Sequence, residues 1–166
     1  MLFFLMALAI PSSVLAAGPE PPQAQPAKFF TQTLDHFNAE AGTWTQRYYS
    51  DARAWSGAAK LGPLLFIPGG EWSVTPEKGL LYGMVRELAA ELGGIAMIAE
   101  HRFYGGSIPF NNSVEEAFQP RADRIGLLSV SQAMADYAKL INHVRDEHGC
   151  PDCPVISFGG SYSGKL

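Results

Sequence analysis

Three short, largely apolar runs, separated by two segments with helical periodicity, dominate the hydrophobic pattern of the chain. The runs cover residues 64–67, 95–98 and 155–158, and glycine or proline precedes each of them. Runs of this length are typical of strands that are buried on both faces, as in a parallel sheet. Glycine-rich turns follow all three runs, so these turns should meet at the carboxyl edge of the sheet, where open α/β sheets place their sites.

Two amphipathic helices are predicted between these runs. The first begins at Thr75–Glu77, with threonine as the cap and proline at the first helical position, and Gly93–Gly94 end it. The second begins at Ser129, which is expected to form a capping box with Gln132. The predicted apolar stripes are Leu81, Val85, Leu88 and Leu92 in the first helix, and Val130, Met134, Tyr137, Ile141 and Val144 in the second. The order strand, helix, strand, helix, strand predicts an α/β fold with a parallel sheet.

The N-terminal segment predicts export of the protein. Residues 1–10 are continuously apolar, and small residues near position 16 suit cleavage after Ala16, so residues 1–16 are expected to be a signal peptide. Because no Lys or Arg precedes the apolar run, a buried N-terminal helix is the alternative. Residues 17–28 are rich in Pro, Gln and Ala, which is typical of an extended linker.

Composition and charge limit what the remaining residues, 29–166, can do. The chain has 166 residues and 47% of them are hydrophobic, which is enough for one domain with a substantial core. Two further strands are expected at 29–37 and 43–50. The formal net charge of −4 offers no basic face for nucleic acid. No segment after the signal peptide reaches the length of a membrane span, so no membrane association is expected once that peptide is removed.

The two cysteines, Cys150 and Cys153, form a C-P-D-C motif. In a cytosolic protein this motif suggests a redox or metal site, but zinc needs two more ligands and none stands nearby at a useful spacing. In an exported chain, a disulfide between the two or with a cysteine elsewhere is favoured. We therefore expect no metal site. Asn111 begins an N-glycosylation sequon in a polar loop, which is a second feature of exported chains.

The segment 154–166 carries the strongest candidate for chemistry. A predicted strand leads directly into Gly159-Gly160-Ser161-Tyr162-Ser163, which is close to the G-x-S-x-G pattern of a nucleophile elbow. An elbow holds its serine on a strained turn between strand and helix, so that the hydroxyl projects from the sheet. Ser163 replaces the final glycine of the pattern but is also small.

Two other interpretations fit the same residues. One is a glycine-rich turn without chemistry. The other is a phosphate loop, since Gly159 to Lys165 reads G-x-x-x-x-G-K after a strand, but Leu166 stands where that motif needs Ser or Thr for magnesium. The rest of the sequence must decide between the three.

An oxyanion hole would complete the elbow. In an α/β-hydrolase one donor is the N–H of the residue after the nucleophile, here Tyr162, and another comes from the loop after an earlier strand, here residues 68–71. Gly70 and Glu71 are the candidate donors in that loop. Each such donor typically stabilises the tetrahedral intermediate by about 3–4 kcal/mol. A phosphate loop would give this earlier loop no role, so the pairing favours the elbow.

His101 is the obvious candidate for a catalytic base, but its place in the chain argues against it. The triad of an α/β-hydrolase follows the order Ser, acid, His, and all four histidines precede Ser161. We expect instead that Glu100 and Arg102 form a supporting ion pair, with His101 packed beside them.

Several motifs, in the right order and with roughly the right spacing, resemble those of one family of serine peptidases. They are Leu34-Asp35-His36-Phe37, Gln46-Arg47-Tyr48, Glu100-His101-Arg102-Phe103-Tyr104-Gly105, Ser107-Ile108-Pro109 and Gly159-Gly160-Ser161-Tyr162. The family comprises lysosomal Pro-Xaa carboxypeptidase, dipeptidyl peptidase II and thymus-specific serine protease. The resemblance covers about residues 29–166, and the combination of motifs is specific.

The resemblance assigns expected roles to individual residues. It implies that Ser161 is the nucleophile and that the N–H of Tyr162 serves the oxyanion hole. Gly69-Gly70-Glu71 is similar to the family's G-x-E-G loop, although Trp72 stands where glycine is usual. The residues expected to form the family's structural motif are Glu100, His101, Arg102, Tyr104 and Gly105.

The resemblance also implies a fold and a function. This chain would hold the N-terminal half of the parallel sheet of an α/β-hydrolase, up to the elbow, with the cap domain and the triad's Asp and His downstream. The expected activity is a serine exopeptidase that needs no cofactor and cleaves peptides at prolyl bonds, as a carboxypeptidase or a dipeptidyl peptidase. The chain itself would be an inactive N-terminal fragment of a secreted or lysosomal protein, and a homodimeric full-length form is an option. A non-catalytic truncated product is the alternative.

Overall fold

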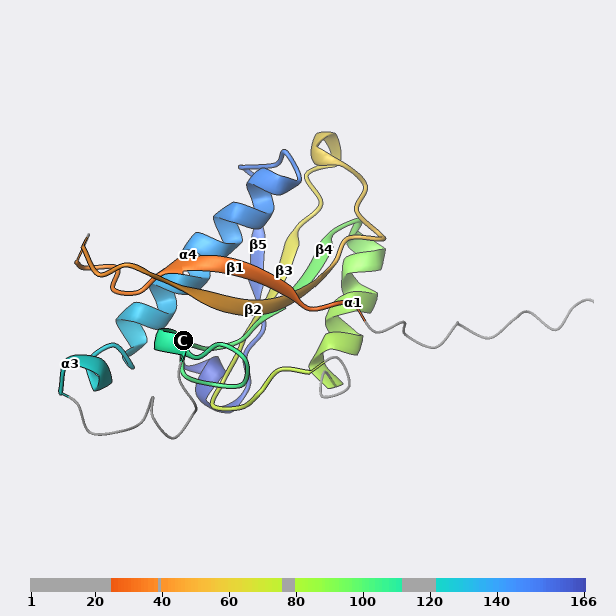
Figure 1. Cartoon of the computed structure of the whole chain (residues 1–166). Helices are drawn as coiled ribbons and strands as arrows, with labels where there is room; N and C mark the ends of the chain where they lie inside the picture. The colour runs from red at the N-terminus through yellow and green to blue at the C-terminus, as the bar shows by residue number, and fades with distance from the viewer. Residues whose placement is uncertain (1–24, 39, 76–79, 112–121) are drawn as a thin grey trace, which may run out of the picture.

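The computed structural model describes residues 25–38, 40–75, 80–111 and 122–166. The predicted signal peptide, most of the predicted linker and Pro76-Glu77 at the predicted start of the first helix lie outside these ranges. Within them, the chain forms one five-stranded mixed sheet with a long helix on each face (Figure 1). No helix in these ranges combines the length and the apolar character that a membrane crossing needs.

The strands lie in the order β1-β2-β4-β3-β5. Their bounds are Lys28–Thr33 for β1, Thr43–Asp51 for β2, Leu64–Pro68 for β3, Ile95–Ala99 for β4 and Val155–Ser157 for β5. β3 is parallel to both β4 and β5, as the apolar runs predicted. β1 and β2 form an antiparallel hairpin, and β2 also pairs antiparallel with β4. A loop as short as residues 34–42 can join antiparallel strands only, because parallel neighbours need a crossover of a dozen or more residues.

The first strand is shorter than predicted and ends at Thr33. The carboxylate of Asp35 accepts a hydrogen bond from the N–H of Phe37 at 2.9 Å. An aspartate that bonds the backbone two residues on mimics a turn, so the chain leaves the strand here although the pattern still alternates.

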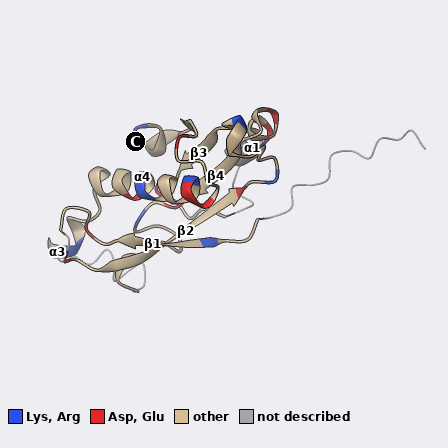
Figure 2. Ribbon diagram, turned by 90° about the horizontal axis from the view of Figure 1, so that it is seen from above, with Lys and Arg blue, Asp and Glu red and all other residues tan. Residues whose placement is uncertain are grey.

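The two long helices cover opposite faces of the sheet. They are α1 (Leu80–Leu92) and α4 (Val130–Glu147), drawn on either side of the strands in Figure 1. Short elements complete the described chain: α3 (Ala122–Ile125) and the 3-10 turns η2 (Ala58–Lys60), η4 (Pro109–Asn111) and η5 (Ser161–Gly164). Charged residues of both signs are interspersed along these elements (Figure 2).

Alternating strand residues fill two separate hydrophobic cores. Leu64 and Phe66 of β3 pack with the residues of α4, whereas Leu65 and Ile67 pack with those of α1. Every residue of β3 is buried, as is every residue of β4. Burying one such side chain is worth about 1.5–3 kcal/mol, so the apolar runs provide much of the free energy that holds the sheet between the helices.

The buried face of α4 differs from the predicted stripe. Tyr137 and Val144 are buried as predicted, but Val130 and Met134 are 50% and 43% exposed. The apolar side chains that face the sheet are Ala133, Tyr137, Leu140 and Val144. The helix is turned because the polar side chains of Gln132 and Asp136 are also buried, so the apolar pattern alone misplaced its inner face.

The start of α4 follows half of the prediction. The hydroxyl of Ser129 accepts a hydrogen bond from the N–H of Gln132, as an N-cap should. The side chain of Gln132 does not return to Ser129, however. It donates to Asp35 at 2.5 Å and accepts from the N–H of His36 at 3.0 Å, so it ties the β1–β2 loop to the helix. The N-cap at Ser129 is therefore confirmed, but the prediction of a full capping box, in which the Gln132 side chain also bonds Ser129, is wrong.

The first helix ends as predicted. Gly93 follows Leu92 with φ 63°, a left-handed conformation that glycine adopts without strain. Val85 is buried and Leu88 packs against the same core, but Leu92 is 46% exposed and Ala89 takes the inner position.

Candidate active site

The turn after β5 has the backbone of a nucleophile elbow. Ser161 has φ 56°, a left-handed conformation that few residues other than glycine adopt. Such a conformation costs a non-glycine residue about 1–3 kcal/mol and persists only where the surrounding structure enforces it. The serine is exposed, in the first position of η5, and residues 158–160 connect it to the parallel strand β5.

Small residues on both sides permit this sharp turn. A Cβ atom on Gly159 would lie 2.2 Å from the carbonyl oxygen of Ser163, so only glycine fits there. The hydroxyl of Ser163 donates to the carbonyl oxygen of Gly160 at 2.9 Å and lies 3.2 Å from its N–H. The serine that replaces the final glycine of the pattern thus fastens the turn that holds Ser161.

The loop after β3, residues 69–74, packs closely on the end of β4. A Cβ atom on Gly69 would lie 2.4 Å from the carbonyl oxygen of Ala99, and one on Gly70 would lie 2.0 Å from the ring of Trp72. The carbonyl oxygen of Gly69 accepts a hydrogen bond from the hydroxyl of Tyr137 at 2.8 Å. Backbone contacts therefore require glycine at position 69, whereas at position 70 an added Cβ would meet only the side chain of Trp72.

Glu100 fastens the far end of that loop. Its fully buried carboxylate accepts hydrogen bonds from the N–H of Val74 at 2.9 Å, the N–H of Gly106 at 2.9 Å and the hydroxyl of Ser107 at 2.8 Å. It also forms an ion pair with Arg47 of β2, 2.5 Å away. One carboxylate therefore joins the loop after β3, the loop after β4 and strand β2.

Arg102 forms its ion pair elsewhere, so the predicted Glu100–Arg102 pair is wrong. The buried guanidinium donates to Asp136 of α4 through Nε at 2.7 Å and through a terminal nitrogen at 2.8 Å. The ring nitrogen Nε2 of His36 lies 2.7 Å from the same carboxylate. Glu100 and Arg102 therefore have separate counter-ions. Glu100 pairs with Arg47 and Arg102 pairs with Asp136, because each buried charge needs a partner of its own.

His101 lies beneath the elbow, as an aromatic packing residue. It is 1% exposed, and the centre of its ring lies 5.5 Å from that of Tyr162 and 5.5 Å from that of Tyr104. Its Nδ1 lies 2.7 Å from the carbonyl oxygen of Arg102, so Nδ1 carries the proton and donates. Burial lowers the pKa of His101 below its ordinary value, which favours the neutral ring.

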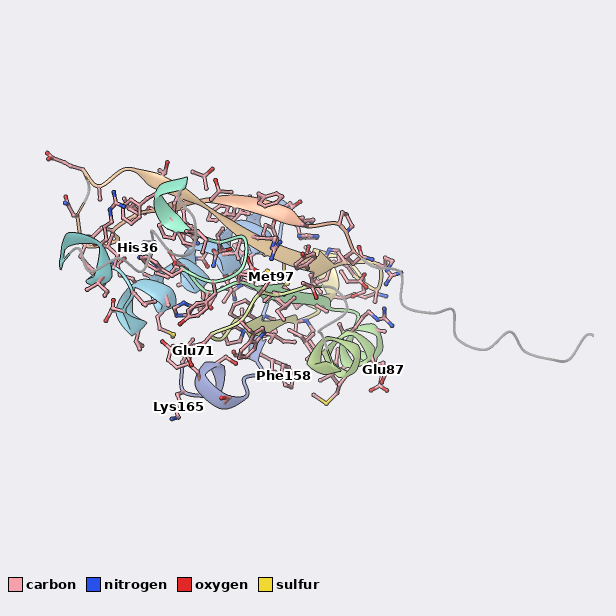
Figure 3. The ribbon with its side chains drawn as sticks, turned by 60° about the horizontal axis from the view of Figure 1, so that its bottom comes forward. His36, Glu71, Glu87, Met97, Phe158 and Lys165 are labelled. Atoms are coloured by element: carbon pink, nitrogen blue, oxygen red, sulfur yellow. A yellow bond between two sulfur atoms is a disulfide. The ribbon has the colours of Figure 1, made fainter. Side chains whose placement is uncertain are left out.

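Glu71 and Tyr104 line the same end of the sheet. Glu71 is exposed, and Figure 3 shows it on the side of the molecule where Phe158 and Lys165 flank the elbow. Burial raises the pKa of Tyr104, and the negative charge of Glu71 raises it further. The loops after β3, β4 and β5 meet at this carboxyl edge (Figure 1), as the sequence predicted.

Other predicted residues lie away from this edge. Cys150 and Cys153 form a disulfide in the turn before β5. Asn111 ends η4, and the rest of its sequon lies outside the described residues. Across the described ranges, no group of three His, Cys, Asp or Glu side chains is arranged to hold a metal ion.

Sequence reasoning missed several residues that organise the site, namely Tyr137, Asp136, Gln132 and Arg47. The apolar stripe predicts Tyr137 as a core residue and does not indicate the hydrogen bond that its hydroxyl makes to Gly69. A signal did exist for Asp136, because it stands beside Tyr137 on the inner face of a helix where an unpaired charge would be costly. Its partner could not be identified, since the arginine lies 34 residues away in the chain.

Several known proteins are similar to this chain in sequence. The pattern of the family described as "Serine carboxypeptidase S28" matches residues 32–166. Mouse lysosomal Pro-X carboxypeptidase is 35% identical over 161 residues, which cover 92% of this chain and 31% of that protein. The human lysosomal Pro-X carboxypeptidase is 35% identical over 83% of this chain and 27% of its own. Human thymus-specific serine protease is 31% identical over 92% of this chain and 28% of its own.

The chain thus spans less than a third of the length of these relatives. The match nevertheless covers most of this chain and includes the elbow, the glycine loop after β3 and the Glu100–Gly105 segment. The chain belongs to the serine carboxypeptidase S28 family of serine peptidases.

Proposed function

We propose that the protein is a serine exopeptidase that cleaves peptides at prolyl bonds, with Ser161 as the nucleophile. The single observation that carries this proposal is the left-handed backbone of Ser161, φ 56°, on an exposed turn after a parallel strand. Strain of this kind concentrates at functional sites. The relatives named Pro-X carboxypeptidase support the prolyl bond and the carboxypeptidase direction.

In the proposed reaction, the Ser161 oxygen attacks the carbonyl carbon of the scissile bond and its proton passes to a base. The electron pair of the carbonyl moves to its oxygen, which is then stabilised by backbone N–H donors of Tyr162 and of the loop after β3. Collapse of this intermediate expels the leaving amine, which takes the proton from the base. Water then repeats the sequence to release the acyl group.

We place the base and its orienting acid downstream of residue 166, in the order that α/β-hydrolases follow. Among the described residues, no hydrogen bond joins Ser161 to a histidine, and His36 and His101 are both held by other groups. The sheet is accordingly proposed as the N-terminal half of an α/β-hydrolase fold, and residues 1–166 alone as inactive. The phosphate-loop interpretation has no support in the family or in the names of these relatives.

The proposed compartment is lysosomal or secretory. It is supported by the apolar N-terminal run, by the disulfide between Cys150 and Cys153, and by the lysosomal relatives. Disulfides persist in oxidising compartments.

Peptide hydrolysis tests the function. The full natural protein, and residues 1–166 as a comparison, are incubated with peptides that end in Pro-Xaa, with a free or a blocked carboxyl terminus. The full protein should release Xaa from the free peptide only, and Ser161→Ala should abolish the release. Release of N-terminal dipeptides would identify a dipeptidyl peptidase instead. Absence of both activities in the full protein would reject the peptidase proposal and favour a non-catalytic product.

A further inference from the structure

The hydroxyl of Tyr137 is a buried polar group that takes no part in the proposed reaction steps. The side chain projects from the middle of α4 toward the sheet, where its ring contacts Phe66 of β3 with 5.3 Å between ring centres. It is 2% exposed, and burial raises its pKa well above the ordinary value of a tyrosine. The hydroxyl therefore keeps its proton and acts as a donor.

The acceptor of that proton is the carbonyl oxygen of Gly69, 2.8 Å away, in the first peptide of the loop after β3. The described chain has no cis peptide bond, so the Gly69–Gly70 peptide is trans. In a planar trans peptide, the C=O of one residue and the N–H of the next point in opposite directions. Because Tyr137 holds the Gly69 carbonyl toward the core, the Gly70 N–H must point away from the core.

The surroundings keep this peptide from turning over. Gly69 packs against the backbone of Ala99, and the ring of Trp72 lies against Gly70, where a Cβ atom would come within 2.0 Å of it. Glu100 holds Val74 at the far end of the loop. Gly70 is buried, and no described residue accepts a hydrogen bond from its N–H, so this donor has no protein partner among the described residues.

We propose that Tyr137 is a positioning residue that fixes the Gly69–Gly70 peptide, so that the N–H of Gly70 is held as the second donor of the oxyanion hole. This inference rests on the proposed peptidase function and adds to it the identity of the donor and the group that orients it. Trp72 contributes by shielding the peptide from water, which strengthens a hydrogen bond to a developing negative charge. The departure from the usual glycine at this position thus acquires a role.

The chemistry of the intermediate explains why orientation matters. The substrate oxygen carries little charge before attack and a full negative charge afterwards, so a correctly aimed N–H stabilises the transition state more than the bound substrate. Loss of one oxyanion donor typically lowers kcat by about 10²–10³-fold. If the donor is present but less firmly oriented, kcat should fall by less, about 10- to 100-fold, and KM should stay unchanged.

The test is Tyr137→Phe in the full natural enzyme, with Tyr48→Phe as the matched control. Tyr48 is a buried tyrosine of the same core cluster, but it lies on β2, and no described hydrogen bond joins its hydroxyl to the glycine loop. Tyr137→Phe should lower kcat about 10- to 100-fold with KM within about twofold. Its affinity for a peptide boronate, which mimics the tetrahedral intermediate, should fall by the same factor. The control should change none of these values by more than about twofold.

Two outcomes would overturn the inference. One is a kcat for Tyr137→Phe that matches the control, and the other is a loss confined to KM. If the unmodified enzyme neither hydrolyses peptides nor binds the boronate, the proposed function fails, and a crystal structure of Tyr137→Phe then decides the positional claim. If the Gly69 carbonyl points in a different direction in Tyr137→Phe, the claim is supported. If it points in the same direction as in the unmodified protein, the claim is refuted.

Discussion

Replacing Asp136 by asparagine should unfold the packing between α4 and the N-terminal hairpin. Asp136 accepts two hydrogen bonds from Arg102 and contacts Nε2 of His36, all within 2.8 Å, and neither Asp136 nor Arg102 is exposed. The substitution keeps the size of the side chain but removes its charge. It also places an amide donor beside groups that themselves donate.

The expected loss in the free energy of unfolding follows from the burial of Arg102. Removing one partner of a buried pair costs about 3–5 kcal/mol, because the remaining charge stays out of water without compensation. Arg102 keeps weaker bonds to the carbonyl oxygens of Leu34 at 3.1 Å and Leu127 at 3.0 Å, which places the expected loss nearer the lower end. Since whole domains are stable by about 5–15 kcal/mol, this loss is large enough to measure and for some domains large enough to unfold them.

Equilibrium unfolding in urea, followed by tryptophan fluorescence, measures this loss. Asp51→Asn is the control, because Asp51 pairs with Arg53 at 2.6 Å but the arginine side chain is 51% exposed. The Asp51 carboxylate is itself only 4% exposed, but the exposed arginine stays hydrated when its partner is removed, so the loss should be smaller than at Asp136. If Asp136→Asn costs no more than the control, the buried pair does not hold the hairpin to α4 and our reasoning about it is refuted.

Three further results are expected. Ser161→Gly should be more stable than Ser161→Ala by about 1 kcal/mol in urea unfolding, because glycine adopts φ 56° without strain; the reverse order would argue against a strained elbow. Gly159→Ala should lower the free energy of unfolding by about 1–3 kcal/mol, more than Gly164→Ala, where the nearest contact of an added Cβ is 3.1 Å. The pKa of His101 is lowered in the folded state, so its contribution to stability should be complete above pH 6.5 and should decline as the pH falls below that value. In melts recorded at several pH values, His101→Gln should therefore lose less stability on acidification than the unmodified protein. An equal loss in the two proteins would contradict the lowered pKa.

The sequence was sufficient to predict the central strands and the turns that follow them. Residues 64–67 and 95–98 are apolar at every position, and only a strand covered on both faces can bury such a run. These strands are local features, so each can be read from a few neighbouring residues. The candidate elbow needed more than its own residues, because a glycine-rich turn and a phosphate loop fit the same segment, and the earlier glycine loop and the order of the elements favoured the elbow.

The polar contacts that connect these elements could not be predicted in the same way. Glu100 binds an arginine 53 residues earlier, and Arg102 binds an aspartate 34 residues later, although the two charges are close enough in sequence to suggest a pair. Burial of Asp136 turned α4 away from its simplest apolar stripe. Hydrophobic periodicity counts apolar positions only, so it takes no account of buried polar side chains, and the position of Asp136 beside Tyr137 does not identify a partner 34 residues away.

The central claim, that Ser161 is an activated nucleophile, is tested most directly by covalent labelling. The full natural protein is treated with a fluorophosphonate, digested, and mapped by mass spectrometry, with Ser161→Ala and Ser163→Ala as comparisons. We predict that the phosphonate is found on Ser161, that Ser161→Ala abolishes it, and that Ser163→Ala retains it. An unlabelled protein, or a label on a different serine, would contradict the claim.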